Sequence, residues 1–200
     1  YSSTATTVVL SKKAQTLEAN HIITASIIAA TTMMYIRILI ISYIFNFEVA
    51  KTILFPFVFF IFLTIIVTYI YYKKASTTTN NITIKDTNPL ELGTAFIFAI
   101  LFIMTMLVTN YVIENFGTNG LRFLSSIIGF ADIDPFILSL LTGKYSIEPV
   151  QIASAIIIAS GSNNILKAIY TLWFGKDKTF SSFILLMILG ILTILVGFFL

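Results

Sequence analysis

The sequence contains no cysteine, a single histidine and few charged residues. Without cysteine, the chain has neither a disulfide scaffold nor a thiolate metal site. Charged residues make up 10% of the chain, compared with about 25% in soluble domains. Apolar residues make up 58%, and the mean hydropathy is +0.97. So few charges cannot cover a water-facing surface, and we therefore expect an integral membrane protein.

Several functional classes have no signature in this sequence. A Ser/His/Asp triad, an HExxH motif, a P-loop and cofactor-binding motifs are all missing, so we predict that the protein is not an enzyme and needs no cofactor. The net charge is +3, and the basic residues lie mostly between apolar runs. This pattern is typical of membrane loops and not of a nucleic-acid-binding stripe. We expect the only histidine, His21, to lie at the membrane interface.

Long apolar runs dominate the rest of the chain. A helix that crosses a membrane needs about 20 apolar residues, and in lipid its backbone polar groups must be satisfied internally. The sequence therefore predicts an all-α fold with about five full transmembrane helices. These are Ile22–Phe45, Ile53–Tyr72, Leu92–Ile113, Pro149–Phe174 and Phe180–Leu200.

A sixth apolar stretch, Leu121–Leu141, is interrupted between Gly129 and Pro135. Asp is a good N-cap and Pro is favoured at the first helical position, so Asp134-Pro135 predicts the start of a new helix. The stretch is therefore either a broken helix that crosses the membrane or a re-entrant hairpin. In both arrangements a helix N-terminus lies at membrane depth.

The two ends of the chain show a candidate internal repeat at an offset of 130 positions. At this offset Arg37 falls on Lys167, and the segment Ser2–Thr7 falls opposite Asp132–Ile137. We interpret residues 1–74 as a first repeat, 75–117 as a polar loop with a linking helix, and 118–200 as a second repeat, all in one membrane domain. The repeats would be parallel if the broken segment crosses the membrane and inverted if it is re-entrant.

The distribution of Lys and Arg favours the inverted arrangement. Basic residues concentrate on the cytoplasmic side of membrane proteins. A re-entrant segment places seven of them on one side against three on the other, whereas a crossing segment gives six against four. The seven are Lys12, Lys13, Lys73, Lys74, Lys85, Lys176 and Lys178, and the three are Lys51, Arg122 and Lys144.

Four segments resemble a known family in order and spacing. They are Ser2–Leu10 followed by Lys12-Lys13, then Asn88–Gly93, then Ile128–Asp134, and finally Asn164 with Lys167-Ala168. Together they resemble the uncharacterised membrane domain found C-terminal to the MgtC/SapB-type region of bacterial and archaeal proteins. In that family the third segment more often reads Gly-Leu-Ala-Asp-Val-Asp-Ala, so Phe130, Ile133 and Pro135 depart from it.

The resemblance implies a multi-pass protein of a prokaryotic cell membrane. It also links the chain by name to magnesium, although that link comes from the accompanying MgtC/SapB-type region. Because the chain begins at Tyr1, inside a polar motif, and not at Met, we expect a missing N-terminal segment with a preceding helix. The expected partners are the lipid bilayer and either a missing N-terminal membrane domain or a second copy of the chain.

Asp132 and Asp134 are the strongest candidate site residues. A carboxylate at the bilayer centre costs about 2.5–3.5 kcal/mol on insertion scales, so such residues usually have a function. Two carboxylates at a helix break could bind a hard cation such as Mg²⁺ or carry a proton. Alternatively, Asp134 only caps a helix and Asp132 pairs with Lys167.

The remaining candidates are polar residues that would complete this site. Hydroxyls and amides would supply oxygen ligands, or exposed amides of the first segment would hold an anion, and two basic residues would tune the charge. These residues are Ser3, Thr4, Thr6, Thr7, Asn163 and Asn164 for the shell, with Lys167 and Arg37 for charge tuning. Helix capping, helix packing and snorkelling of the two basic side chains explain them without any ligand.

Two functions are therefore open. The first is a transport module for a small ion, with a divalent cation as the expected ion. The second is a regulatory or scaffold membrane protein that does not transport. A transporter should have a cavity that touches both aspartates, whereas a scaffold should bury them in closed salt bridges.

Overall fold

The computed structural model describes residues 2–15, 20–75 and 92–200, and all regular elements within these ranges are helices. In chain order these are α1 (Ser3–Ala14), α2 (Asn20–Phe45), α3 (Phe47–Lys74), α4 (Leu92–Ile128), α5 (Ile133–Thr142), α6 (Pro149–Gly175), a 3₁₀ turn (Lys176–Thr179) and α7 (Phe180–Phe199). Lys85 and the tripeptide Asn81-Ile82-Thr83, which has the sequence of a formal glycosylation sequon, lie outside the described residues.

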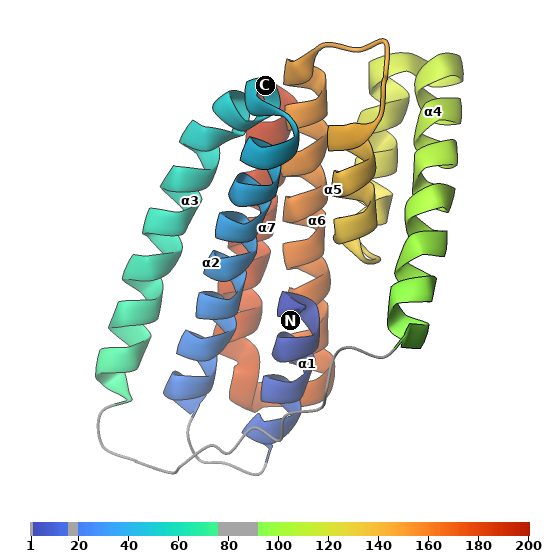
Figure 1. The fold of residues 1–200 in the computed structure, drawn as a ribbon. Helices are drawn as coiled ribbons and strands as arrows, with labels where there is room; N and C mark the ends of the chain where they lie inside the picture. The colour runs from blue at the N-terminus through green and yellow to red at the C-terminus, as the bar shows by residue number, and fades with distance from the viewer. Residues whose placement is uncertain (1, 16–19, 76–91) are drawn as a thin grey trace.

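Four stretches of the described chain are long and apolar enough to cross a membrane. They are Asn20–Phe45, Phe47–Lys74, Phe96–Ile128 and Pro149–Phe199. The last stretch holds both α6 and α7, which run antiparallel on either side of the 3₁₀ turn (Figure 1). The protein is therefore an all-α, multi-pass membrane protein, as the sequence predicts.

Helix boundaries differ from the predicted ones where capping residues extend a helix beyond its apolar run. The helix predicted from Ile53 begins at Phe47, because the side chain of Asn46 accepts a hydrogen bond from the Val49 amide at 3.2 Å. This cap leaves a single residue between α2 and α3, so the two helices form a tight antiparallel pair.

The interrupted segment is re-entrant. α4 reverses direction at Gly117, whose φ of 59° lies in the left-handed region that glycine adopts most readily. The second limb of α4 (residues 118–128) then descends to mid-depth, and α5 returns to the end from which this limb came (Figure 1). Of the two arrangements open from the sequence, the structure has the hairpin.

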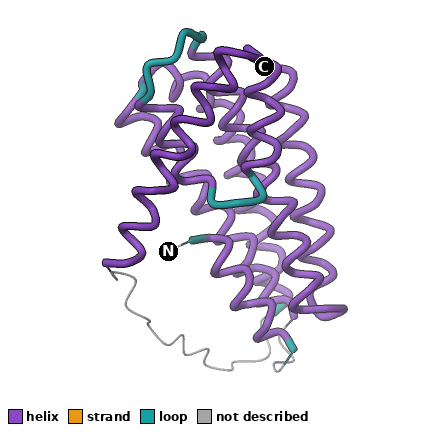
Figure 2. Tube along the Cα trace, turned by 90° about the vertical axis from the view of Figure 1, so that its right-hand side faces the viewer, coloured by secondary structure: helices purple, strands orange, loops and turns teal. Residues whose placement is uncertain are grey.

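α1 and α5 are short helices that both begin near the middle of the bundle. From there α1 runs to one end and α5 to the other, and the helices that follow continue in opposite directions (Figures 1 and 2). Their N-caps, Ser2 and Asp132, stand at the 130-residue offset. These directions agree with an inverted repeat. The repeat and its unit bounds stay predictions, although α3 does end at Lys74 and the chain does reverse at Gly117.

The two ends of the bundle carry unequal charge. The end where α1, α3 and α6 terminate, here called the basic end, has six of the described Lys and Arg residues, and the opposite end has three. The basic end holds Lys12, Lys13, Lys73, Lys74, Lys176 and Lys178, and the opposite end holds Lys51, Arg122 and Lys144. The positive-inside rule therefore predicts that the basic end is cytoplasmic.

α6 is the central helix of the bundle. Its residues from Ile152 to Asn164 are all buried, whereas α4 exposes most of the side chains that the structure describes. Gly161 packs directly on α7, because a Cβ there would lie 2.8 Å from the carbonyl oxygen of Gly190. Small residues are what allow two helices to approach this closely in lipid, where apolar side chains gain little by leaving the surrounding chains. The rigid α6–α7 pair thus supports the half-helices that begin at mid-depth.

Candidate functional site

The N-terminal ends of α1 and α5 are held near each other by one side chain of α6, Asn163. Its amide nitrogen donates to the carbonyl oxygen of Gly129 at 3.2 Å, in the turn before α5. Its amide oxygen lies 3.5 Å from the hydroxyl of Thr4, in the first turn of α1. Asn163 is buried, so these bonds fix both segments against the centre of the bundle.

The turn before α5 lies directly on α6. A Cβ built on Gly129 would come within 2.2 Å of the Ser162 Cβ and 2.7 Å of the Ala159 carbonyl oxygen. Only glycine permits this approach without movement of the backbone. The turn is therefore seated at a defined depth by α6.

Asp132 and Asp134 have different roles in this turn. Asp132 is exposed, and its carboxylate accepts a hydrogen bond from the Asp134 amide at 3.2 Å, so it is the N-cap of α5. Asp134, which the sequence suggested as the cap, lies in the first turn of α5 and accepts from Arg37 at 2.5 Å. The cap position is therefore two residues earlier than expected, and only Asp134 is in an ion pair.

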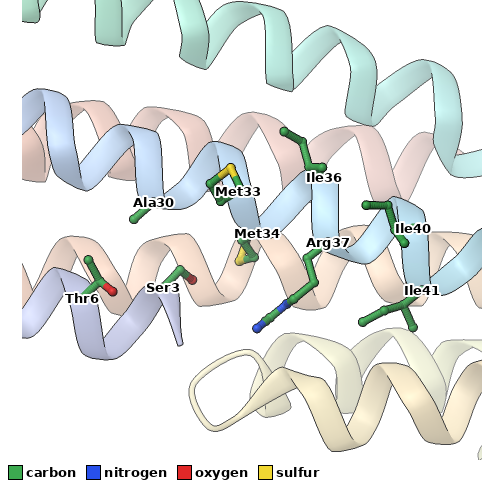
Figure 3. A pocket seen from close by; sticks show the side chains of 9 residues that line it. All are labelled: Ser3, Thr6, Ala30, Met33, Met34, Ile36, Arg37, Ile40 and Ile41. Carbon is green, nitrogen blue, oxygen red and sulfur yellow. The ribbon is translucent and has the colours of Figure 1, made fainter. Parts of the chain in front are cut away.

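Arg37 belongs to α2 and extends toward the space between the starts of α1 and α5 (Figure 3). Its side chain is 35% exposed, and that of Asp134 is 26% exposed. The guanidinium nitrogen Nε is buried and has no hydrogen-bond partner among the described residues. Arg37 thus neutralises the carboxylate of Asp134, which is the charge-tuning role expected from the sequence. It uses only part of its hydrogen-bond donors to do so.

Lys167 does not lie beside the aspartates as expected. Its side chain is fully buried, and its ammonium group donates to Met34 Sδ at 3.1 Å and to Asn164 Oδ1 at 3.3 Å. No carboxylate within the described ranges lies within ion-pair distance of it. An ammonium without a counter-charge is costly to bury, which makes Lys167 the least compensated group of the described chain.

Asn164 belongs to a closed polar network and not to a ligand shell. Its amide nitrogen donates to the hydroxyl of Tyr35 at 2.6 Å, and that hydroxyl lies 3.0 Å from the hydroxyl of Thr193. All three side chains are fully buried. The network ties α2, α6 and α7 together beside Lys167. Tyr35 and Thr193 were not among the predicted residues, because hydroxyls in apolar runs give no sequence signal.

Two threonine hydroxyls of α1 form hydrogen bonds within their own helix. Thr6 and Thr7 donate to the carbonyl oxygens of Ser2 and Ser3, at 3.1 and 2.9 Å. Such back-bonding satisfies them within their own helix. The segment expected to offer free backbone is therefore helical from Ser3 onward, with Ser2 as its cap.

A cavity of about 500 Å³ lies between the start of α1 and the middle of α2 (Figure 3). Arg37 contributes its only charge. The lining residues are Ser3, Thr6, Ala30, Met33, Met34, Ile36, Arg37, Ile40 and Ile41. Neither aspartate lines it, so this cavity does not meet the criterion for a transporter, and the exposed Asp132 does not meet the criterion for a scaffold. Arg37 lines the cavity, whereas Lys167 does not and lies behind Met34, to whose sulfur it donates.

A cation site built from the two aspartates is not assembled in this geometry. Groups of three or more His, Cys, Asp or Glu side chains that could hold a metal ion do not occur among the described residues. Asp132 is engaged as a cap and Asp134 is paired with a cation already. A divalent ion would have to displace Arg37 before it could use both carboxylates.

These features define a multi-pass α-helical membrane protein with a re-entrant hairpin and a charged centre at mid-depth. The chain belongs to the family described as "Domain of unknown function (DUF4010)", which matches residues 1–175. It is also similar to an uncharacterized protein of the bacterium Aquifex aeolicus, with 29% identity over 156 residues that cover 76% of this chain and 68% of that protein. No solved structure matches it.

Proposed function

We propose that the protein is a membrane transport module for a small ion, and that the ion passes the charged centre formed by Arg37, Asp134 and Lys167. One observation carries this proposal. The half-helices α1 and α5 both begin at mid-depth and run to opposite ends of the bundle. The Arg37–Asp134 ion pair and the buried ammonium of Lys167 lie near their starts. Secondary transporters place their sites at such helix breaks near the midplane.

Energetics favour a function for this centre. Charged side chains are rare inside membranes because burying them is unfavourable, and they persist mainly along ion pathways or at binding sites. Both side chains of the Arg37–Asp134 pair are partly exposed, and Arg37 lines the cavity, so the pair can open when an ion competes for either partner. A pair that opens and closes supplies the two states that alternating access requires.

Two further points remain proposals: that the protein is related to MgtC/SapB-type proteins, and that the transported ion is a divalent cation. The first rests on sequence motifs, and the second rests on that resemblance and on the two carboxylates. The prokaryotic cell membrane is the proposed location, and the bacterial relative agrees with it.

A regulatory or scaffold role is the second candidate, and the Arg37–Asp134 pair favours it. A pair that never opens would hold α2 against α5 and nothing more. The two functions differ in whether the pair has to separate during activity.

Ion flux into proteoliposomes with the purified protein tests the proposal. The panel contains Mg²⁺, Mn²⁺, Ni²⁺, H⁺ and a short carboxylate, each measured with wild type and with the double variant R37Q/D134N. This variant removes both charges together, so neither is left unpaired. The matched control is Lys12→Gln, far from the centre at the basic end. We expect flux of at least one ion that the double variant abolishes and the control retains. No flux for any ion, with folded protein, would move the assignment to the regulatory role.

A further inference from the structure

We infer that the cavity beside Arg37 is a binding site for an organic anion, namely a monocarboxylate with an apolar tail. This inference deepens the proposed function by naming the ion, and it replaces the divalent cation expected from the sequence. It rests on the cavity, on Arg37 in its wall and on the chemistry of the other lining residues.

The first step is the charge balance of the described groups at this centre. Asp134 is the only carboxylate in an ion pair there, and it accepts from one guanidinium nitrogen, Nη2. Lys167 has only neutral acceptors, the sulfur of Met34 and the amide oxygen of Asn164. Asp132, the other carboxylate of this turn, is exposed and caps α5, and it forms no ion pair with either basic side chain. An anion that enters beside Arg37 would meet a guanidinium that Asp134 uses only in part, whereas a cation would have to compete with that guanidinium for Asp134.

The second step is the donor capacity of Arg37. A guanidinium carries five N–H donors in a planar fork that fits a carboxylate through two parallel bonds. Here Nη2 donates to Asp134, and Nε is buried without a partner among the described residues, so the side chain must turn to offer Nε to a ligand. Arg37 lines the cavity and faces the hydroxyl of Ser3 across it (Figure 3). A carboxylate at this position would meet a charged fork on one side and a hydroxyl donor on the other.

The third step is the wall. Apart from Ser3, Thr6 and Arg37, the lining residues are all apolar. A strongly hydrated ion such as Mg²⁺ or phosphate would lose its water against this wall and gain few partners. A short alkyl chain would instead be well solvated by the methionine and isoleucine side chains. A volume of about 500 Å³ lies within the usual range for small organic ligands, about 300–1,000 Å³.

The start of α1 adds to the same field. Its first turn is the positive end of a helix dipole, which favours an anion. Ser3 and Thr6 bring this turn to the cavity. The helix end alone would not identify a ligand, but it agrees in sign with the two basic side chains.

Calorimetric titration of the full chain in detergent micelles tests the inference, with hexanoate as the probe. Hexanol and hexylammonium have the same tail and control for uptake by the micelle. We expect saturable binding of hexanoate alone, and an affinity that rises by about three- to fourfold for each methylene from acetate to hexanoate. Hexanoate binding that does not exceed hexanol binding, with folded protein, overturns the site.

The variant Asp134→Asn distinguishes an anion site from a cation site. Asp134 competes with the ligand for Arg37, so this variant should bind hexanoate about tenfold more tightly, since a bond to a charged group contributes that order of affinity. The double variant R37Q/D134N should lose the gain and fall below wild type, while Lys12→Gln should bind as wild type does. A cation site predicts the reverse, with loss of Mg²⁺ binding in Asp134→Asn, and that result would overturn the inference.

Binding and flux separate this inference from the proposed function. Mg²⁺ flux without hexanoate binding would reject the carboxylate and keep transport. Hexanoate binding without flux would keep the site and reject transport, leaving a ligand-regulated membrane protein. A parallel titration with oleate identifies the source of the ligand, because a preference for the long chain would assign it to the bilayer and a preference for hexanoate to the aqueous phase.

Discussion

The two half-helices α1 and α5 occupy corresponding places, but their charges differ. α5 begins with two aspartates, one of which pairs with Arg37 of α2. α1 begins with hydroxyl residues, and at the position that corresponds to Asp134 by the 130-residue offset it has Thr4. Lys167, which falls on Arg37 at the same offset, has no carboxylate within ion-pair distance among the described residues. The start of α5 thus brings two carboxylates near one guanidinium, whereas the start of α1 brings none to Lys167.

This difference makes the centre asymmetric. A symmetric centre with two ion pairs would be closed, and one with none would repel any cation. The asymmetric centre keeps one pair as structure and leaves one cation uncompensated. The following experiments test this asymmetry, in order of decreasing expected effect.

The largest expected effect concerns the opposite directions of the two halves. Because the chain has no cysteine, single cysteines can be introduced directly, and no native cysteine has to be removed first. A membrane-impermeable maleimide should label Lys12→Cys and Lys176→Cys from one side, and Lys51→Cys and Lys144→Cys from the other. Equal labelling of the Lys12 and Lys144 positions from one side would contradict the re-entrant hairpin and, with it, the opposed half-helices.

The next effect concerns how tightly each half is seated on α6. Gly129→Ala places a methyl group 2.2 Å from the Ser162 Cβ and 2.7 Å from a backbone carbonyl oxygen, so the turn must shift. We expect a loss of about 2–3 kcal/mol of stability in detergent unfolding. Ala131→Ser, at an exposed position of the same turn, should be nearly neutral. If Gly129→Ala were equally neutral, the turn before α5 would not rest on α6.

A matched pair of substitutions tests the charge asymmetry itself. Arg37→Met leaves the carboxylate of Asp134 unpaired and should cost about 1–3 kcal/mol, below the range for a fully buried pair because both side chains are partly exposed. Lys167→Met removes a buried ammonium that has only neutral partners, and should be neutral or stabilise the fold by about 1 kcal/mol. Thermal unfolding midpoints measure both, and a larger loss for Lys167→Met than for Arg37→Met would mean that Lys167 has a counter-charge after all.

The sequence predicts the helices well because the requirements of lipid are simple. Five apolar runs of sufficient length, and a sixth broken between Gly129 and Pro135, lead to α2–α7 with shifts at the ends, whereas α1 lies in a polar segment that was not predicted to be helical. Asn46 extends α3 by six residues relative to the predicted start at Ile53, because an N-cap fixes a helix start more strongly than the first residue of an apolar run does.

The centre could be predicted only in part. Intramembrane charges are conspicuous in a sequence, so Arg37, Asp134 and Lys167 were found. Their pairing was not, because it depends on which faces of α2, α5 and α6 meet, and the approach of Gly129 to α6 sets that geometry. The network of Tyr35 and Thr193 was missed because a hydroxyl in an apolar helix can satisfy itself on its own backbone and gives no signal of a partner.

The smallest effect separates capping from charge at the two helix starts. Asp132→Ala removes the cap of α5, whose bond to the Asp134 amide is 3.2 Å long, and should cost about 1 kcal/mol. Ser2→Ala should cost less, since the bond from the Ala5 amide to the Ser2 hydroxyl is 3.5 Å long. Asp132→Asn is the informative control, because asparagine caps a helix as well as aspartate does but carries no charge. If Asp132→Asn keeps wild-type stability and hexanoate binding, Asp132 acts through its cap alone, and the basic side chains Arg37 and Lys167 set the sign of the site. If Asp132→Asn lowers the stability as much as Asp132→Ala does, the charge of the carboxylate itself stabilises the start of α5. The charge of Asp132 then has to be counted together with the Arg37–Asp134 pair.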